Sequence, residues 1–242
     1  MPCGVILEGE EGARDFVDDK RRALIALLLV GLAPTTSILI SFGTEGGLFS
    51  QIAYILSKIW MVALPLYWYL KIDAGTLSWS KPERGGYGMA IGLGLGMSAI
   101  MLAAWLLLGK GLDDNLLRNA VEPVGLLDAR LYIGAVLYWI LVNSLLEEYV
   151  FRWFLVVKSE TVVGTGTPAI ILSAVCFVLQ HTVALAFFGF PWWANLLASS
   201  GLFVGGAVFS WLYIRYRSIW IPYIAHAICD VTVFSIGAIM LF

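Results

Sequence analysis

The sequence predicts an all-α membrane protein, a polytopic transmembrane helix bundle of about seven helices (six to eight) around an intramembrane cavity that faces the cytosol. Three features favour this class: the fractions of apolar and charged residues, the mean hydropathy and the pattern of apolar runs. Hydrophobic residues make up 60% of the 242 residues and charged residues 13%, and the mean hydropathy is +0.86; soluble domains are roughly 45–50% apolar and 25% charged. The third feature is that the apolar residues gather in runs near or above the ~20 residues that a helix needs to cross ~30 Å of hydrocarbon.

Seven apolar runs follow one another along the chain, and each is read as one membrane helix. They cover residues 23–42, 51–70, 86–109, 131–157, 167–189, 195–214 and 218–242. The long fourth run is expected to tilt, kink or divide near Arg152. No other stretch of soluble composition is long enough to fold alone, so we expect a single membrane-embedded domain over 23–242 with its functional core at about 131–242.

Residues 1–22 mix acidic and basic side chains and lack the basic, apolar and small-residue pattern of a cleaved signal peptide. We expect a retained, loosely structured cytosolic leader. With the N-terminus inside, eleven Lys and Arg residues fall on the cytosolic side and three, Lys110, Arg118 and Arg130, on the other. This bias follows the positive-inside rule. The expected location is an integral protein of a prokaryotic plasma membrane with a cytoplasmic N-terminus.

Small residues predict where helices approach closely. Glycines recur every four residues at 88, 92 and 96 in the third run and at 201 and 205 in the sixth. Three cysteines, Cys3, Cys176 and Cys229, are an odd number, so they are expected to be small buried hydrophobes rather than a disulfide framework. No basic patch or zinc-finger spacing indicates a nucleic-acid partner; the lipid bilayer is the expected surrounding, and the oligomeric state is not indicated.

An acidic pair and an arginine interrupt the fourth run at Glu147, Glu148 and Arg152. A charged side chain at a bilayer centre costs ~2.5–3.5 kcal/mol on insertion scales, so such a cluster is by default a functional site. Helical spacing divides the group into two stripes: Asn143, Glu147 and Phe151 on one, and Ser144, Glu148 and Arg152 on the other. Arg152 is thus placed to hold Glu148, and Asn143 could orient Glu147.

The chain has two histidines, His181 and His226, and both lie in predicted spans. Phe177 precedes His181 by one helical turn, and His226 precedes Asp230 by one turn, so each pair shares a helix face. With a rise of ~1.5 Å per residue, the histidines and the acidic pair can meet near mid-depth. Three helices therefore present polar faces toward a common site.

Hydrolysis of an amide is the chemistry that best suits these groups. Two adjacent carboxylates in a low dielectric cannot comfortably both ionise, unless Arg152 compensates one of them, which leaves a plausible general base. A water held between Glu147 and His181 would be polarised for attack on a carbonyl, with His226 placed to donate to the developing oxyanion. Covalent catalysis is less favoured, because no Ser has a base at a defined spacing and Cys229 has no evident activating group.

Three motifs follow in order in the fourth, fifth and seventh apolar runs: Glu147-Glu148-x-x-x-Arg152, Phe177-x-x-x-His181 and His226-x-x-x-Asp230. They resemble the CPBP family, the CAAX-protease and bacteriocin-processing (Abi) group of intramembrane glutamic endopeptidases, over residues 143–231. The resemblance implies that Glu147 is the water-activating base, assisted by His181, with Glu148 and Arg152 as support. It also implies that His226 and residue 230 contact the oxyanion or the substrate amide. Phe151 and Phe177 are expected to pack the site.

One position departs from the pattern, because the prenyl-protein proteases of this family have Asn where this chain has Asp230. An ionised Asp would repel an oxyanion, so Asp230 is protonated, orients His226, or belongs to a subgroup that uses the position differently. We favour a metal-free mechanism without cofactor. Zinc is the alternative, held by Glu147, His181 and His226, which are acceptable ligands by type.

The substrate class implied by this resemblance is a membrane-associated peptide or protein, such as a lipidated, leader or sorting-tail peptide. Two other functions stay open. A non-catalytic immunity or scaffold member of the same family would keep the motifs without cleaving a substrate. A membrane transporter could also use intramembrane Glu and His side chains, although no inverted pair of broken helices is evident in the sequence.

Overall fold

The computed structural model describes residues 4–43 and 48–242. These ranges form helices that are joined by loops, and they contain no strand. The α-helices are α1 (Gly4–Gly31), α2 (Ala33–Gly43), α3 (Leu48–Tyr67), α4 (Tyr87–Leu108), α5 (Asp114–Val121), α6 (Ala129–Tyr138), α7 (Ser144–Glu147), α8 (Val157–Val163), α9 (Thr167–Phe187), α10 (Trp192–Tyr216) and α11 (Trp220–Leu241). Short 3₁₀ or π-helical segments extend or join them, namely η1 (Trp68–Ile72), η2 (Gly109–Gly111), η3 (Glu122–Val124), η4 (Trp139–Asn143) and η5 (Glu148–Val156). The all-α class is confirmed.

Seven segments of the described chain are long and apolar enough to cross a membrane, which confirms the polytopic bundle. They are Val17–Ile40, Leu48–Ile72, Tyr87–Gly111, Ala129–Val163, Thr167–Phe187, Trp192–Tyr216 and Trp220–Leu241. The fourth span neither breaks nor divides at Arg152. It continues as one helix from α6 through η4, α7 and η5 to α8, with the two π-helical segments inside it.

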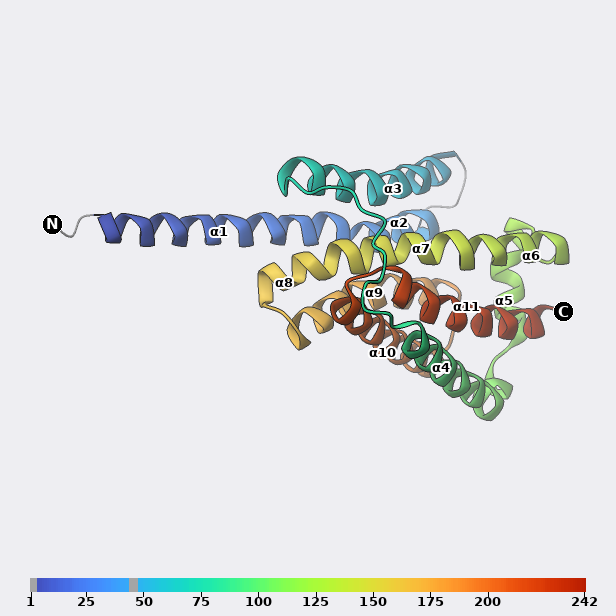
Figure 1. Cartoon of the computed structure of the whole chain (residues 1–242). Helices are drawn as coiled ribbons and strands as arrows, with labels where there is room; N and C mark the ends of the chain where they lie inside the picture. The colour runs from blue at the N-terminus through green and yellow to red at the C-terminus, as the bar shows by residue number, and fades with distance from the viewer. Residues whose placement is uncertain (1–3, 44–47) are drawn as a thin grey trace.

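The expectation of a loosely structured leader is wrong for residues 4–22. Helix α1 begins at Gly4 and runs to Gly31 without interruption, and its first half extends beyond the rest of the bundle (Figure 1). The leader contains several strong helix formers (Glu, Ala, Arg and Lys), and Asp18 stands four residues before Arg22, a spacing that favours helix. The many charged residues of this segment therefore did not indicate an absence of helix. Cys3 lies outside the described residues.

The fourth span lies at the centre of the bundle (Figure 1). On one side α1 packs against α8 and η5, and α2 pairs with α3. On the other side α9 packs against α10, and α11 against α4. Buried apolar residues form one cluster around η5 with Val150, Phe151 and Phe177, and a second around α11 with Ala90 and Ala225. Both clusters adjoin the polar groups of the fourth span.

Close helix packing occurs at other glycines than those expected. A Cβ at Gly94 would lie 3.1 Å from the Ala225 Cα, and a Cβ at Gly206 would lie 3.0 Å from a ring carbon of Phe177. The expected positions 88, 92, 96 and 201 face open space, and position 205 has only ordinary contacts. The four-residue repeat was therefore a wrong guide, because several faces of these helices carry glycine and spacing cannot tell which face meets a neighbour.

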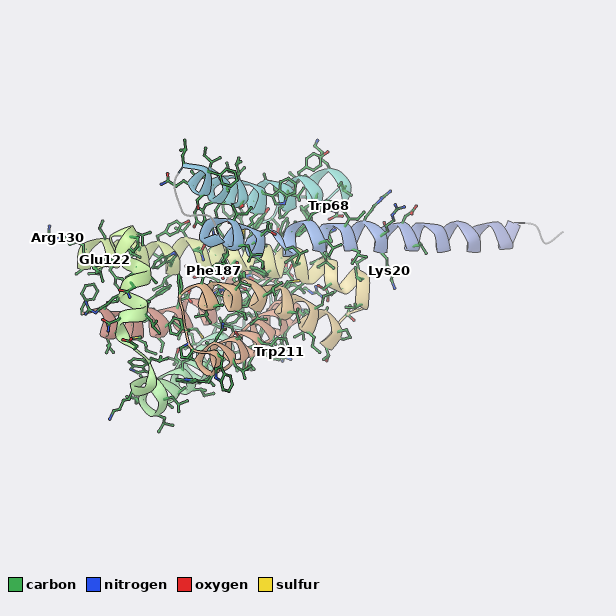
Figure 2. The ribbon with its side chains drawn as sticks, turned by 180° about the vertical axis from the view of Figure 1, so that it is seen from behind. Lys20, Trp68, Glu122, Arg130, Phe187 and Trp211 are labelled. Atoms are coloured by element: carbon green, nitrogen blue, oxygen red, sulfur yellow. The ribbon has the colours of Figure 1, made fainter. Side chains whose placement is uncertain are left out.

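The N-terminal end of α11 is fixed by the loop that precedes α4. The Ile219 backbone N–H donates to Ser80 Oγ at 3.0 Å, and the Trp220 indole N–H donates to the Trp79 carbonyl at 2.8 Å. This loop lies at the opposite end of the spans from α5. Figure 2 shows the same polarity, with Lys20 toward one end of the molecule and Glu122 and Arg130 at the other.

Candidate active site

The acidic pair lies where the second π-helical segment of the fourth span begins. Glu147 is the last residue of α7, and Glu148 is the first residue of η5. A π-helical turn widens the helix and changes which side chains share a face, and such turns are frequent at functional sites. Adjacent residues of a helix point in different directions, so the two neighbouring carboxylates face different partners.

Glu148 is the buried member of the pair. Its Oε2 lies 3.2 Å from Arg152 Nε, and both side chains are fully buried. This is the ion pair that the four-residue spacing predicts. None of the three guanidinium nitrogens of Arg152 has a hydrogen-bond partner among the described residues, so its contact with Glu148 is an ion pair without a hydrogen bond. A buried cation whose N–H donors are unsatisfied is costly, so the aromatic rings around this arginine carry part of its stabilisation.

Three phenylalanine rings enclose the guanidinium. Its Cζ lies 4.6 Å from the centroid of Phe177, 5.4 Å from that of Phe209 and 5.8 Å from that of Phe151. Cation–π contacts of this kind strengthen when the cation is removed from water. Phe151 and Phe177 thus pack the site as expected, while Phe209 on α10 was not anticipated.

His226 bridges the two carboxylates. Its Nδ1 lies 2.8 Å from Glu148 Oε1, and because the other oxygen of Glu148 faces Arg152, the carboxylate accepts and Nδ1–H donates. Its Nε2 lies 3.7 Å from Glu147 Oε2 and 3.6 Å from Asp230 Oδ2. The ring also stacks on Phe209 at 4.9 Å. His226 is therefore held in one orientation with Nε2 directed toward Glu147 and Asp230.

Asp230 is paired with a serine that was not proposed as a site residue. Ser144 Oγ lies 2.5 Å from Asp230 Oδ2 and 2.7 Å from the Trp139 carbonyl oxygen. Ser144 is buried, whereas 20% of the Asp230 side chain is exposed. The contact joins α7 to α11 across 86 residues of sequence, so spacing within one helix could not reveal it.

Glu147 is more accessible than Glu148, with 13% of its side chain exposed against none for Glu148. Asn143 Nδ2 donates to Glu147 Oε1 at 2.9 Å, which leaves Oε2 toward His226. Lys58 Nζ in turn donates to Asn143 Oδ1 at 3.3 Å. Lys58 was not proposed as a site residue, although a cation inside an apolar span was a signal that it needed a partner.

His181 lies beside this group without a direct bond to it. Its Nδ1 is 2.8 Å from the Phe177 carbonyl oxygen, so Nδ1–H donates and Nε2 has no hydrogen-bond partner among the described residues. The Phe177 ring stands 4.7 Å from His181 and 5.8 Å from His226. No described hydrogen bond or ion pair joins His181 to Glu147.

The two hollows described, of about 550 and 360 Å³, are not lined by site residues.

A metal site would need several His, Cys, Asp or Glu side chains close together. In residues 4–43 and 48–242, no group of three or more His, Cys, Asp or Glu side chains lies close enough together to hold a metal ion. Glu147, His181 and His226 are suitable ligands by type, but in this arrangement they do not form a ligand set.

Residues 129–232 match the family model described as Rce1-like: type II CAAX prenyl endopeptidase Rce1-like. The segment that holds the site is therefore similar to this family. This confirms the resemblance to the CPBP family and indicates a CAAX-type intramembrane protease at the family level. The Rce1-like segment runs from the start of the fourth span into the seventh and contains all of the proposed site residues. No curated protein and no solved structure matches the chain.

Proposed function

We propose that this protein is an intramembrane endopeptidase that hydrolyses a peptide bond of a membrane-associated substrate, with Glu147 and His181 activating water. The observation that carries the proposal is the division of the acidic pair. Glu148 is fully buried with Arg152, whereas Glu147 is partly exposed and keeps one oxygen toward His226. A buried, paired carboxylate is a structural group, and an accessible one beside a histidine can act as a base.

In the proposed reaction, four side chains divide the proton transfers and the stabilisation of charge. Glu147 Oε2 accepts a proton from water while Asn143 holds Oε1, and the water oxygen forms a bond to the substrate carbonyl carbon. His181 Nε2 supplies a second acceptor for that water. His226 donates from Nε2 to the oxyanion while Glu148 accepts from Nδ1. When the C–N bond breaks, the proton on Glu147 passes to the leaving amine.

Asp230 fits this reaction best as a neutral acid. One hydroxyl proton on Ser144 cannot serve both acceptors, the Asp230 carboxyl and the Trp139 carbonyl. A protonated Asp230 removes the conflict, because it donates to Ser144 Oγ, and Ser144 donates to Trp139. A neutral group at this position does not repel an oxyanion, which reconciles Asp230 with the Asn of the prenyl-protein proteases.

The finer features of the proposal are the substrate, the metal-free mechanism and the topology. A lipidated C-terminus is the first substrate class to test, because the matching model is named for CAAX prenyl endopeptidases; leader and sorting-tail peptides are the others. We place the protein in a prokaryotic plasma membrane with its N-terminus in the cytoplasm. Stoichiometric zinc in the purified protein, lost together with activity on chelation, would replace the metal-free mechanism with a zinc one.

The experiment that tests the function compares membrane proteomes of cells that carry the wild-type protein or Glu147→Gln. We expect new peptide termini in wild-type membranes that are absent from the variant, because Gln keeps the shape of Glu147 but cannot accept the proton. Equal amounts of the two proteins in the membrane are the control for folding. If no new peptide terminus depends on Glu147, the peptidase proposal fails, and a non-catalytic or transport function is favoured instead.

A further inference from the structure

Lys58 is the one charged side chain of α3 between Leu48 and Tyr67, and it lies in a span that is otherwise exposed along most of its length. A lysine there would ordinarily extend its ammonium to the membrane surface. Instead, Lys58 Nζ donates to Asn143 Oδ1 at 3.3 Å, and lies 5.4 Å from the ring centroid of Tyr54. The Lys58 ammonium is thus directed toward Asn143 on the fourth span.

The contact belongs to a chain of three groups. Lys58 donates to Asn143 Oδ1, and Asn143 Nδ2 donates to Glu147 Oε1 at 2.9 Å. An amide has one accepting and one donating end, and its two orientations are close in shape. An ammonium has no acceptor, so it fixes which end of Asn143 faces α3. The NH₂ end must then face Glu147.

The reverse orientation would direct the amide oxygen at the Glu147 carboxylate. Two acceptors facing each other in a low dielectric repel, and Glu147 would turn away from its place beside His226. We therefore propose that Lys58 is a positioning residue for Glu147, acting through the orientation of Asn143. The inference rests on the proposed function, since it concerns how the proposed base is held.

This role separates Lys58 from the other polar contacts of α3. Trp60 Nε1 donates to the Leu29 carbonyl at 3.0 Å, which ties α3 to α1 without reaching the site. Trp60→Phe is therefore the matched control: it removes a hydrogen bond of the same helix but leaves the chain from Lys58 to Glu147 intact. If loosening α3 were enough to lower activity, both variants would show it.

The test measures kcat and KM on a peptide that spans a bond whose cleavage depends on Glu147 in the membrane-proteome comparison. Lys58→Met should lower kcat by roughly 10- to 100-fold with little change in KM, as expected when a reacting group is displaced by about 1 Å. Lys58→Arg should keep part of the rate, because a guanidinium is also a pure donor. Trp60→Phe should match the wild type, and all variants should elute as the wild type does in detergent.

A double-mutant cycle distinguishes positioning through Asn143 from a direct effect of the charge. Asn143→Ala should lower kcat to a similar degree, and adding Lys58→Met to it should cause no further loss. Wild-type kcat in Lys58→Met, or a full additional loss in the double variant, would overturn the inference. An active Glu147→Gln in the same series, or no Glu147-dependent bond to test, would instead overturn the proposed function on which the inference rests.

Discussion

At the scale of single residues, Glu147 and Glu148 are neighbours in sequence whose surroundings assign them different tasks. Glu148 is enclosed with Arg152 and aligns His226, and Glu147 remains accessible. Charge therefore stays inside the span at tolerable cost only because each ion has a partner. The ion pair with Arg152 offsets the desolvation of Glu148, and the hydrogen bond from Asn143 offsets that of Glu147.

The proposed neutral state of Asp230 gives a prediction at this scale. Asp230→Asn should retain most of the cleavage activity, because an amide N–H can donate to Ser144 Oγ as a protonated carboxyl does. Asp230→Leu, with a similar shape and no donor, should lose it. Initial cleavage rates of the purified variants measure the difference. An Asn variant as inactive as the Leu variant would show that the charge of Asp230 is needed.

Which contacts could be predicted follows from how far apart the partners are in sequence. The bonds from Asn143 to Glu147 and from Arg152 to Glu148 join residues four apart, so helical spacing indicates them. The bonds of His226 to Glu148 and of Ser144 to Asp230 join different helices, 78 and 86 residues apart. They depend on how helices are rotated and packed, which spacing within one span does not contain.

At the scale of helices, hydropathy indicates where a span lies but not which face it packs. All seven spans were predictable because a run of apolar residues is a local property. The packing glycines were not, because which glycine meets a neighbour depends on contacts between helices. The π-helical segments beside the acidic pair were not predicted either. A Cβ atom at Gly94 would lie against the backbone of Ala225, next to His226 on α11. A Cβ atom at Gly92, two residues earlier on the same helix, would meet no atom within 4 Å.

This difference predicts unequal effects of one substitution at two positions of α4. Gly94→Val should destabilise the protein by about 1–3 kcal/mol, the usual cost of overpacking, and lower the cleavage rate by displacing Ala225 and His226. Gly92→Val faces open space and should change neither. Thermal unfolding in detergent and initial rates measure the two effects. Equal loss in both variants would mean that α4 and α11 do not approach at Gly94.

At the scale of the whole molecule, the spans have two distinct ends. The loop with Trp79 and Ser80 lies where α11 begins, and α5 lies where α11 ends, since Arg118 of α5 donates to the Leu241 carbonyl. Figure 2 shows Arg130 at one end of the molecule and Lys20 toward the other. The distribution of Lys and Arg predicts that the first end is cytosolic. The proposed substrate would then be reached from the cytosolic side or from the lipid.

Labelling of single cysteines tests this orientation. In a variant without the three native cysteines, Lys110→Cys should react with a membrane-impermeant thiol reagent on intact cells, because its loop is predicted to be outside. Lys81→Cys should react only after the membrane is opened. The opposite pattern would reverse the topology and place the substrate on the outer side.

The central claim is that Glu147 is the base of an intramembrane peptidase. The most direct measurement is the cleavage rate of a peptide that spans a Glu147-dependent bond, with purified wild-type protein and purified Glu147→Gln in the same detergent. We predict steady cleavage by the wild type and a loss of at least about 100-fold in the variant, in keeping with the contribution of a general base. Cleavage by Glu147→Gln at the wild-type rate would contradict the claim.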